Sequence, residues 1–254
     1  MNVTKCNRDN AIKVAAFAIE FDSQVSSPEI AALYEYCSSG QSDFFQKARY
    51  LEGFSVQFTL DGNHSDRGPN KLGVILIGPD SWELIYRENL IVFQTTMYAS
   101  WENSLEYFNK SIEFFFDFLL SQNIKKRITT VGLDFLDEFI INDSNSNWLT
   151  DLFSKKSKYL PSFVFEQKDF WHTHIGFYRD KILNIANLDY VCDEDDKHIQ
   201  RISSLHRCRN LAYEIPSNVK PEIFEYFDEM HSLNVELIKD LLTKQVLNDI
   251  GFEE

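Results

Sequence analysis

The chain alternates between stretches whose apolar residues follow the period of a strand and stretches that follow the period of a helix. Residues 11–21 read AIKVAAFAIEF, a nearly continuous apolar run that predicts a central strand covered on both faces. Residues 54–60 place Phe, Val, Phe and Leu at every second position, which predicts a half-buried strand. Residues 101–122 place large apolar side chains three and four positions apart, which predicts an amphipathic helix packed on a sheet.

The same order of elements occurs twice along the sequence. The first half is predicted to contain a strand at 11–21, a helix at 28–50, strands within 54–96 and a helix at 101–122. The second half is predicted to contain a strand at 127–141, a short helix at 147–153, strands within 162–214 and a helix at 219–250. We therefore expect an α+β fold of two pseudo-repeated β-α-β(3-4)-α halves, 1–126 and 127–254, packed intimately together. Each half is expected to form an antiparallel sheet with helices packed on one side.

Local signals set some of the boundaries. The sequence Ser26-Ser27-Pro28-Glu29 predicts a helix start, because serine caps the first turn, proline fits it and an acid suits its positive end. Ser100 is expected to cap the next helix. The short turns at 78–80 and 88–89 separate successive strands, which predicts antiparallel pairing in a meander.

The charge is strongly and unevenly acidic. The net charge is −14, and residues 128–254 hold 13 Lys and Arg against 23 Asp and Glu, a net charge of −10. Nucleic-acid binding depends largely on Lys and Arg that neutralise phosphates, so this composition disfavours direct nucleic-acid binding. An acidic surface suits solubility, and it also suits a protein partner with a basic surface.

Cysteine usage and hydropathy indicate a compartment. The four cysteines, Cys6, Cys37, Cys192 and Cys208, have no paired spacing, and no signal-like segment opens the chain. No apolar run approaches the ~18 residues that a membrane-spanning helix needs. We therefore expect a cytoplasmic protein with no membrane association, and a homo-oligomer stays open.

Two histidines are the candidate lining of a ligand pocket. His172 and His174 lie two positions apart in a predicted strand, so both imidazoles point to the same face. A four-ligand zinc site could also be drawn with Cys192, His198, His206 and Cys208. The tight paired spacings typical of zinc sites are missing, so we predict neither a metal nor a cofactor.

One acidic run is the candidate contact for a basic partner. It comprises Asp193, Glu194, Asp195 and Asp196. The run lacks the alternating acids, the glycine and the final glutamate of a calcium loop. A solvated hairpin tip is the simpler interpretation of such a charge run.

The middle of the chain carries a recognisable pattern. Tyr98, Trp101 and Glu102 open the helix that contains Phe108 and runs to Leu120, and a strand beginning at Arg127 follows with Gly132, Leu133, Phe135 and Asp137. This pattern resembles an uncharacterised prokaryotic family described only as sporadically distributed, with a Tyr-x-x-Trp-Glu motif and a strand like R-I-G-L-R-Y-I-N/D. Asp134 stands where that pattern usually has arginine. The resemblance implies no assigned reaction, and the patchy distribution of the family suits mobile, defence or toxin–antitoxin loci.

Two classes of function follow from these patterns. The favoured hypothesis is a non-catalytic cytoplasmic binding protein, an immunity, antitoxin or accessory component of a bacterial defence or toxin–antitoxin locus. It is motivated by the repeated element order, the acidity and the missing catalytic motifs. The alternative is an enzyme or small-molecule sensor with its site between the two halves, where pockets commonly form.

Overall fold

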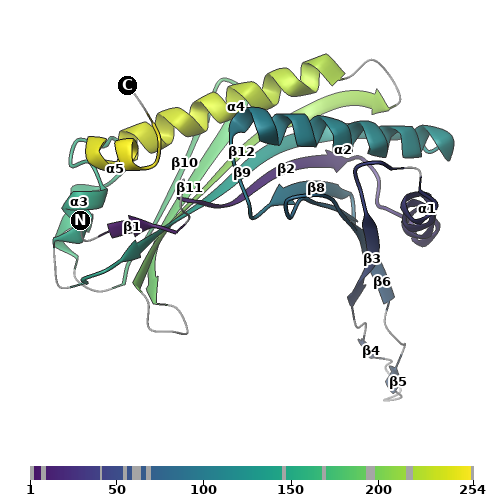
Figure 1. Ribbon diagram of the computed structural model, residues 1–254, viewed down its shortest axis with the longest axis horizontal. Coiled ribbons are helices and arrows are strands. Elements are labelled where there is room, and N and C mark those ends of the chain that lie inside the picture. Colours follow the sequence, from purple (N-terminus) through teal and green to yellow (C-terminus); the bar gives the residue numbers. More distant parts are fainter. Residues whose placement is uncertain are drawn as a thin grey trace.

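A ten-stranded antiparallel sheet arches beneath two long helices in the computed structural model of the protein (Figure 1). The structure describes residues 3–6, 10–40, 42–53, 56–58, 64–66, 70–144, 147–167, 170–192, 198–215 and 220–252. The strands of the sheet lie in the order β10-β11-β12-β9-β2-β8-β7-β6-β3, and β1 pairs with β9 beside β12 and β2. Their bounds are β1 Val3–Lys5, β2 Ile12–Phe21, β3 Lys47–Gly53, β6 Asn70–Ile77, β7 Glu83–Arg87, β8 Leu90–Thr95, β9 Lys126–Ile141, β10 His172–Arg179, β11 Ile182–Cys192 and β12 His198–Ile215.

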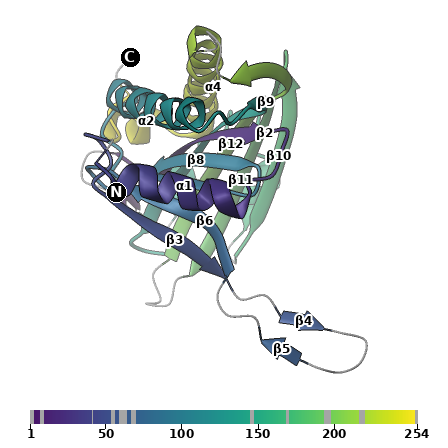
Figure 2. The same ribbon diagram turned by 90° about the vertical axis from the view of Figure 1, so that its right-hand side faces the viewer.

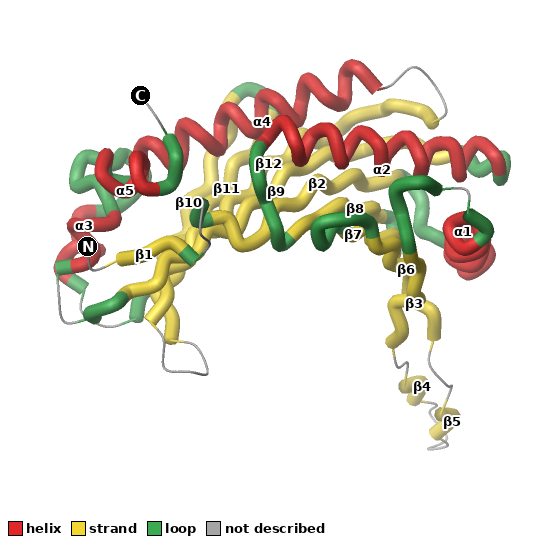
Figure 3. The backbone as a smooth tube through the Cα atoms, viewed as in Figure 1, coloured by secondary structure: helices red, strands yellow, loops and turns green. Residues whose placement is uncertain are grey.

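The helices and a small hairpin complete the fold. Figure 3 shows the helices, in red, gathered along one side of the yellow sheet. Figure 2 shows that β4 (Val56–Phe58) and β5 (His64–Asp66), which pair only with each other, project beyond the main sheet. The helices are α1 Ser27–Ser38, α2 Trp101–Ser121, α3 Trp148–Leu152, α4 Lys220–Leu241 and α5 Lys244–Asp249, with a 3-10 turn η1 at Ser162–Glu166.

The predicted fold class is wrong in its central point. The chain does not form two β-α-β repeats, each with its own sheet and helices on one side, because the strands of both predicted halves join one sheet. Strand β9 makes this join, since it pairs with β2 on one edge and with β12 on the other. The expected boundary between 1–126 and 127–254 falls at the first residues of β9. Element order along the chain could not reveal which strands become neighbours.

The predicted element types hold in most places, and two helix ends differ. Helix α1 ends at Ser38 rather than near Tyr50, and residues 47–53 pair with β6 as β3. The predicted closing helix is broken into α4 and α5, where Thr243 caps α5 and its hydroxyl accepts a hydrogen bond from the Val246 amide at 3.4 Å. At the end of α1, Ser39 and Gly40 are a stop signal that the predicted range crossed. At the end of α4, the apolar period continues past Thr243 into α5, so the pattern alone does not show the break.

The predicted caps are confirmed. Ser26 and Glu29 form a capping box, in which the Ser26 hydroxyl accepts from the Glu29 amide and the Glu29 carboxylate accepts from the Ser26 amide. The Ser100 hydroxyl accepts from the Asn103 amide at the start of α2. These contacts satisfy backbone donors that have no partner within a helix, so they fix where both helices begin.

Two apolar clusters hold the helices on the sheet. The larger one lies beneath α1, α2 and the first turns of α4, and it is rich in phenylalanine. At its centre the ring of Phe17 on β2 stacks on Phe108 of α2, with ring centroids 4.6 Å apart. The smaller cluster lies beneath α3, α5 and the last turns of α4. The described residues form no second layer on the opposite face of the sheet (Figure 1).

Candidate functional site

The face of the sheet opposite the helices is concave and carries no other layer among the described residues (Figure 1). We call it the uncovered face. It consists of the side chains that alternate with those packed against the helices, such as Ala16 and Ala18 beside Phe17 on β2. Strand β2 is central in the sheet, as predicted, and side chains on both of its faces are buried. Among the described residues, however, a second layer covers only its helix-side face.

The register of the strands aligns one residue from each of nine strands across this face. Arg49 begins the row on β3 and Tyr178 ends it on β10. The row, which we call the cross-strand row, is Arg49, Ile75, Ile85, Val92, Ala18, Gly132, Arg207, Leu183 and Tyr178. Its side chains run from a basic end through aliphatic groups to a basic and aromatic end.

The smallest side chains of the row lie at its centre. Ala18 and its neighbour Ala16 are only 6% and 7% exposed although no helix lies over them. The larger half-buried Ile85 and Val92 lie on one side of them, and Arg207 lies on the other. We call this aliphatic middle of the concave face the trough, and its smallest side chains lie on β2 and β9.

A bidentate ion pair between β12 and β9 lies on one side of the trough. The Arg207 guanidinium donates to both carboxylate oxygens of Asp134, and the Nη2–Oδ2 distance is 2.6 Å. Arg207 reaches Asp134 by lying over Gly132, where a Cβ atom would come within 2.4 Å of the Arg207 Nη1. Glycine is thus required at position 132 because the guanidinium occupies the space of a side chain. Asp134, which departs from the family pattern, has a partner of opposite charge.

Other charges on the uncovered face are also paired between strands. The Arg201 Nε donates to Glu138 at 2.9 Å, and the Arg49 Nη2 donates to Glu83 at 3.3 Å. The face thus presents apolar and paired polar groups, in contrast to the outer helices. Helices α2 and α4 together hold ten acids against three lysines.

The two predicted pocket histidines lie on the uncovered face at its β10 edge. The His172 Nδ1 contacts the Asp189 carboxylate, and the His174 Nδ1 lies 2.6 Å from the Asn187 side-chain oxygen. Both histidines are exposed, and both contacts join β10 to β11. The structure therefore gives them cross-strand partners and does not bring them together in a closed cavity. The acidic run Asp193, Glu194, Asp195 and Asp196 lies outside the described residues.

The remaining candidate zinc ligands point away from His172 and His174. His206 and Cys208 are fully buried on the helix side of β12, the opposite face of the sheet. Among the residues that the structure describes, no group of three or more His, Cys, Asp or Glu side chains could hold a metal ion. The zinc set that can be drawn from the sequence is therefore not assembled in the fold.

His206 instead belongs to a buried polar network beneath α4. Its Nδ1 lies 2.7 Å from the Asn184 side-chain oxygen, and its Nε2 lies 3.3 Å from the Asn234 side chain, which also accepts from the Ser204 hydroxyl at 2.6 Å. Burial lowers the pKa of His206 to about 4, so the imidazole is neutral at pH 7. A neutral ring carries a single N–H, so at any moment it donates to only one of the two amide oxygens that face it, those of Asn184 and Asn234.

Asp137 is a second buried titratable group on the helix side of the sheet. It lies on β9 between Phe135 of the larger cluster and Phe139 of the smaller one. Its Oδ2 has no hydrogen-bond partner within the described part of the chain. Burial raises the pKa of the carboxyl to about 7. This motif residue therefore titrates near neutrality inside the core, where solvent cannot reach it.

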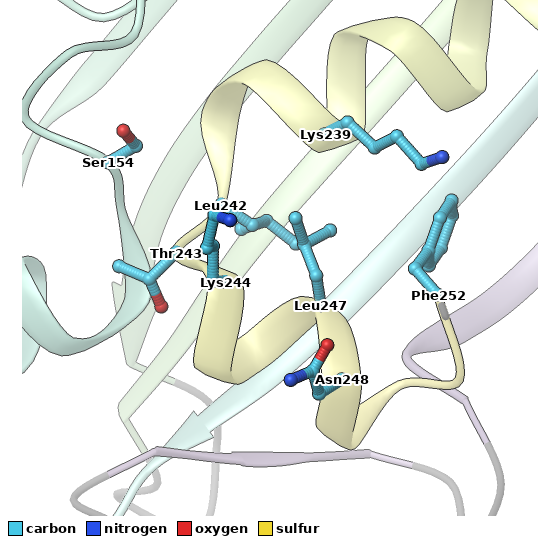
Figure 4. Close-up of a pocket in the computed structure, with 8 residues that line it drawn as sticks. All are labelled: Ser154, Lys239, Leu242, Thr243, Lys244, Leu247, Asn248 and Phe252. Atoms are coloured by element: carbon cyan, nitrogen blue, oxygen red, sulfur yellow. The ribbon is translucent and has the colours of Figure 1, made fainter. Parts of the chain in front are cut away.

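Two open hollows lie at opposite ends of the molecule. One, of about 780 Å³, lies where α4 meets α5 and is drawn in Figure 4, where Leu242 and Leu247 form its floor beside Lys239 and Phe252. The other, of about 800 Å³, lies beside the β10–β11 turn. We call it the β12 cleft, and its charged and aromatic lining is Tyr178, Asp180, Lys181, Arg207, Arg209, Tyr213 and Tyr226. Only the second hollow adjoins the uncovered face.

Sequence reasoning missed the arginines that define this site. Arg201, Arg207 and Arg209 alternate with buried residues along β12, and a period of two on a predicted strand places all three on one face. That alternation was readable in the sequence. Asp134 and Glu138, the partners of Arg207 and Arg201 on β9, are distant in sequence, so the pairing itself required the strand order.

The aromatic motif of the family resemblance packs α2 against its surroundings. Tyr98 packs edge-on against Phe135 at 6.0 Å, and Trp101 stacks on Phe17 at 5.6 Å. The Trp101 Nε1 donates to Asp228 of α4 at 3.1 Å. The aromatic motif therefore lies away from the uncovered face, and its contacts hold α2 against β2, β9 and α4.

Comparisons with known proteins identify no relative. No family model matches the chain, and no curated protein matches it. A solved structure, S. pombe Pct1 RNA triphosphatase in complex with the Spt5 CTD, aligns with a TM-score of 0.13 and 6% identity over 94% of this chain and 83% of that chain. A similarity this low carries no argument about fold or function. Among the described residues, no helix is long and apolar enough to cross a membrane.

Proposed function

We propose that this protein is a non-catalytic binding protein that docks a protein partner on the uncovered face of its sheet. The observation that carries the proposal is the apolar trough of the cross-strand row. Ile85, Val92 and Leu183 are half-buried there without a layer above them. Strands that are apolar on both faces are typical of sheets covered on both faces, and an exposed apolar patch rimmed by polar groups commonly marks an interface.

The partner is expected to have a basic surface. The field of a chain with net charge −14 attracts a basic protein during diffusion and raises its association rate. The trough then supplies the apolar contact that sustains binding, since burial of apolar surface is the main favourable term in association. Arg49, Arg201 and Arg207 on this face are each paired with an acid of a neighbouring strand. This favours a protein partner over a nucleic acid, whose phosphates need free cations.

The cellular role that we propose is an immunity, antitoxin or accessory component acting in the cytoplasm. Support for this role comes from the pattern around Trp101 and from the four free cysteines, of which Cys37 and Cys208 are buried. An enzyme or sensor is the second hypothesis, and it requires a cavity with converging polar groups.

Affinity capture of the tagged protein expressed from its native locus tests the proposal, with mass spectrometry to identify what is retained. We expect one stoichiometric basic protein. The variant Val92→Lys should abolish its capture, because a cation in the trough repels a basic partner and loses apolar contact. The flexible stem of lysine can carry its charge to solvent on an uncovered face, so the fold should survive.

Leu120→Lys is the matched control. Leu120 is 58% exposed at the end of α2, outside the uncovered face, so the same change in charge should leave capture intact. Equal capture by the wild type and both variants would contradict docking on the uncovered face. Capture of no protein, together with a measurable hydrolytic activity, would favour the enzyme hypothesis instead.

A further inference from the structure

We propose that the β12 cleft binds a nucleotide, with cationic side chains that contact the phosphates and a tyrosine ring that stacks on the base. This goes beyond the proposed docking of a protein partner and does not depend on it. The cleft has a volume of about 800 Å³, within the range of small-molecule sites in proteins.

The cleft exists because two neighbouring strands end at different places. Pairing of β11 with β12 stops at Ile182 and Cys208, but β12 continues to Ile215 along β9. The β10–β11 turn therefore leaves one edge of β12 open. A bulge between Arg209 and Tyr213, with Asn210 at a φ of 62°, turns that edge away from regular pairing. Bulges commonly re-aim side chains near functional sites and discourage the addition of another strand.

Three cations converge on this cleft within an acidic protein. Arg207 and Arg209 are two residues apart on β12 and point to the same face, and Lys181 lies in the two-residue turn that joins β10 to β11. Arg207 is held by Asp134, which fixes its guanidinium. Within the described part of the chain, neither the Lys181 nor the Arg209 side chain takes part in an ion pair. One acid, Asp180, lines the cleft beside the three cations.

The kinds of side chain that line the cleft fit phosphate chemistry. Free lysine and arginine side chains provide several donors for phosphate oxygens, and arginine matches them in a bidentate manner. Asp134 and Asp180 neutralise part of this positive charge, and a bound phosphate would offset the repulsion that remains.

An aromatic wall distinguishes a nucleotide from a simple anion. Tyr178 ends the cross-strand row and is 67% exposed, so much of its side chain is open to solvent. Across the cleft, Tyr213 and Tyr226 approach each other with their hydroxyl oxygens 3.5 Å apart. Exposed tyrosine rings beside cations are the groups on which nucleotide bases stack.

Isothermal titration calorimetry of the full chain tests this site with three probes, ADP, pyrophosphate and adenosine, at constant ionic strength. We expect ADP to bind more tightly than pyrophosphate, and both to bind more tightly than adenosine. Arg209→Gln and Lys181→Gln should each lower the affinity for ADP by roughly tenfold or more, since each removes a charged hydrogen bond. Tyr178→Ala should lower the affinity for ADP and leave the affinity for pyrophosphate unchanged.

Lys110→Gln is the control for general electrostatics. Lys110 lies on the exposed side of α2 and pairs with Glu106, so the same loss of charge there should not change ADP affinity. Thermal melting of each variant reports whether its fold is retained. Absence of heat with every probe, or equal weakening by Lys110→Gln and Lys181→Gln, would overturn the site. Equal affinity of pyrophosphate and ADP would overturn base stacking. Failure here leaves partner capture through Val92 unaffected, so the two proposals are tested separately.

Discussion

The indole of Trp101 and the imidazole of His231 lie face to face, with ring centroids 4.1 Å apart and planes that differ by 1°. This contact joins the first turn of α2 to the middle of α4, beside the hydrogen bond from Trp101 to Asp228. Residues 130 positions apart in sequence thus fasten the two long helices to each other above the sheet. Burial lowers the pKa of His231, which favours the neutral ring in this stack.

Replacing Trp101 should loosen this junction. We expect Trp101→Ala to lower the free energy of unfolding by about 2–4 kcal/mol, because it removes a large partly buried ring and the bond to Asp228. Urea unfolding of Trp101→Ala, His231→Ala and the double variant measures the coupling between the rings. A coupling of about 0.5–1.5 kcal/mol is expected for a stacked pair. Additive effects would mean that the stack contributes nothing beyond burial.

Asp137 should make the protein less stable at neutral and higher pH. Its folded pKa of about 7 lies above the ordinary value of 3.8, so the folded state holds the proton more tightly than the unfolded chain does. This contribution to stability is complete below about pH 4 and is lost as pH rises through about 7, by up to about 4 kcal/mol. Asp137→Asn should therefore be more stable than the wild type at pH 8, as measured by urea unfolding. A less stable variant at pH 8 would show that the ionised carboxylate has a favourable partner.

His206 should have the opposite pH dependence. Its folded pKa of about 4 lies below the ordinary value of 6.5, so the unfolded chain takes up the proton first. This contribution is complete above about pH 6.5 and is lost as pH falls toward 4, by up to about 3 kcal/mol. The free energy of unfolding of His206→Gln should therefore not show this decrease as the pH falls from about 6.5 to 4. The exposed His172→Gln serves as control and should retain it.

The two groups oppose each other between about pH 4 and 6.5, which gives a further check. Acidification strengthens the fold through Asp137 and weakens it through His206. The unfolding free energy of the wild type should accordingly vary less with pH in this range than that of Asp137→Asn or His206→Gln. A profile for Asp137→Asn that rises on acidification would contradict both assignments.

A side chain at position 132 should displace Arg207. The Cβ of Gly132→Ala would come within 2.4 Å of the Arg207 Nη1 and 2.6 Å of its Cδ. We expect a loss of about 1–3 kcal/mol in unfolding free energy, as is usual for overpacking. Adding Arg207→Ala should recover most of the lost stability, because it empties the space that the new methyl group needs. No rescue in the double variant would mean that the strain lies in the backbone of β9.

The sequence determined the type of most elements. The apolar period of residues 101–121 gave α2, and the capping residues Ser26 and Ser100 gave the starts of two helices. The meander β6-β7-β8 was also predictable, since short turns force neighbouring strands to pair. Such features depend on residues that are close together along the chain.

Only the tertiary structure decided how the strands are ordered and which residues lie on the uncovered face. The sequence predicted two sheets, but β9 joins β2 to β12 across more than a hundred residues, and a repeat of element order does not encode that neighbour choice. The same pairing creates the Arg207–Asp134 contact and the β12 cleft. Sequence patterns report local periodicity, whereas a surface assembled from nine strands depends on long-range register, which the packing of the whole sheet sets.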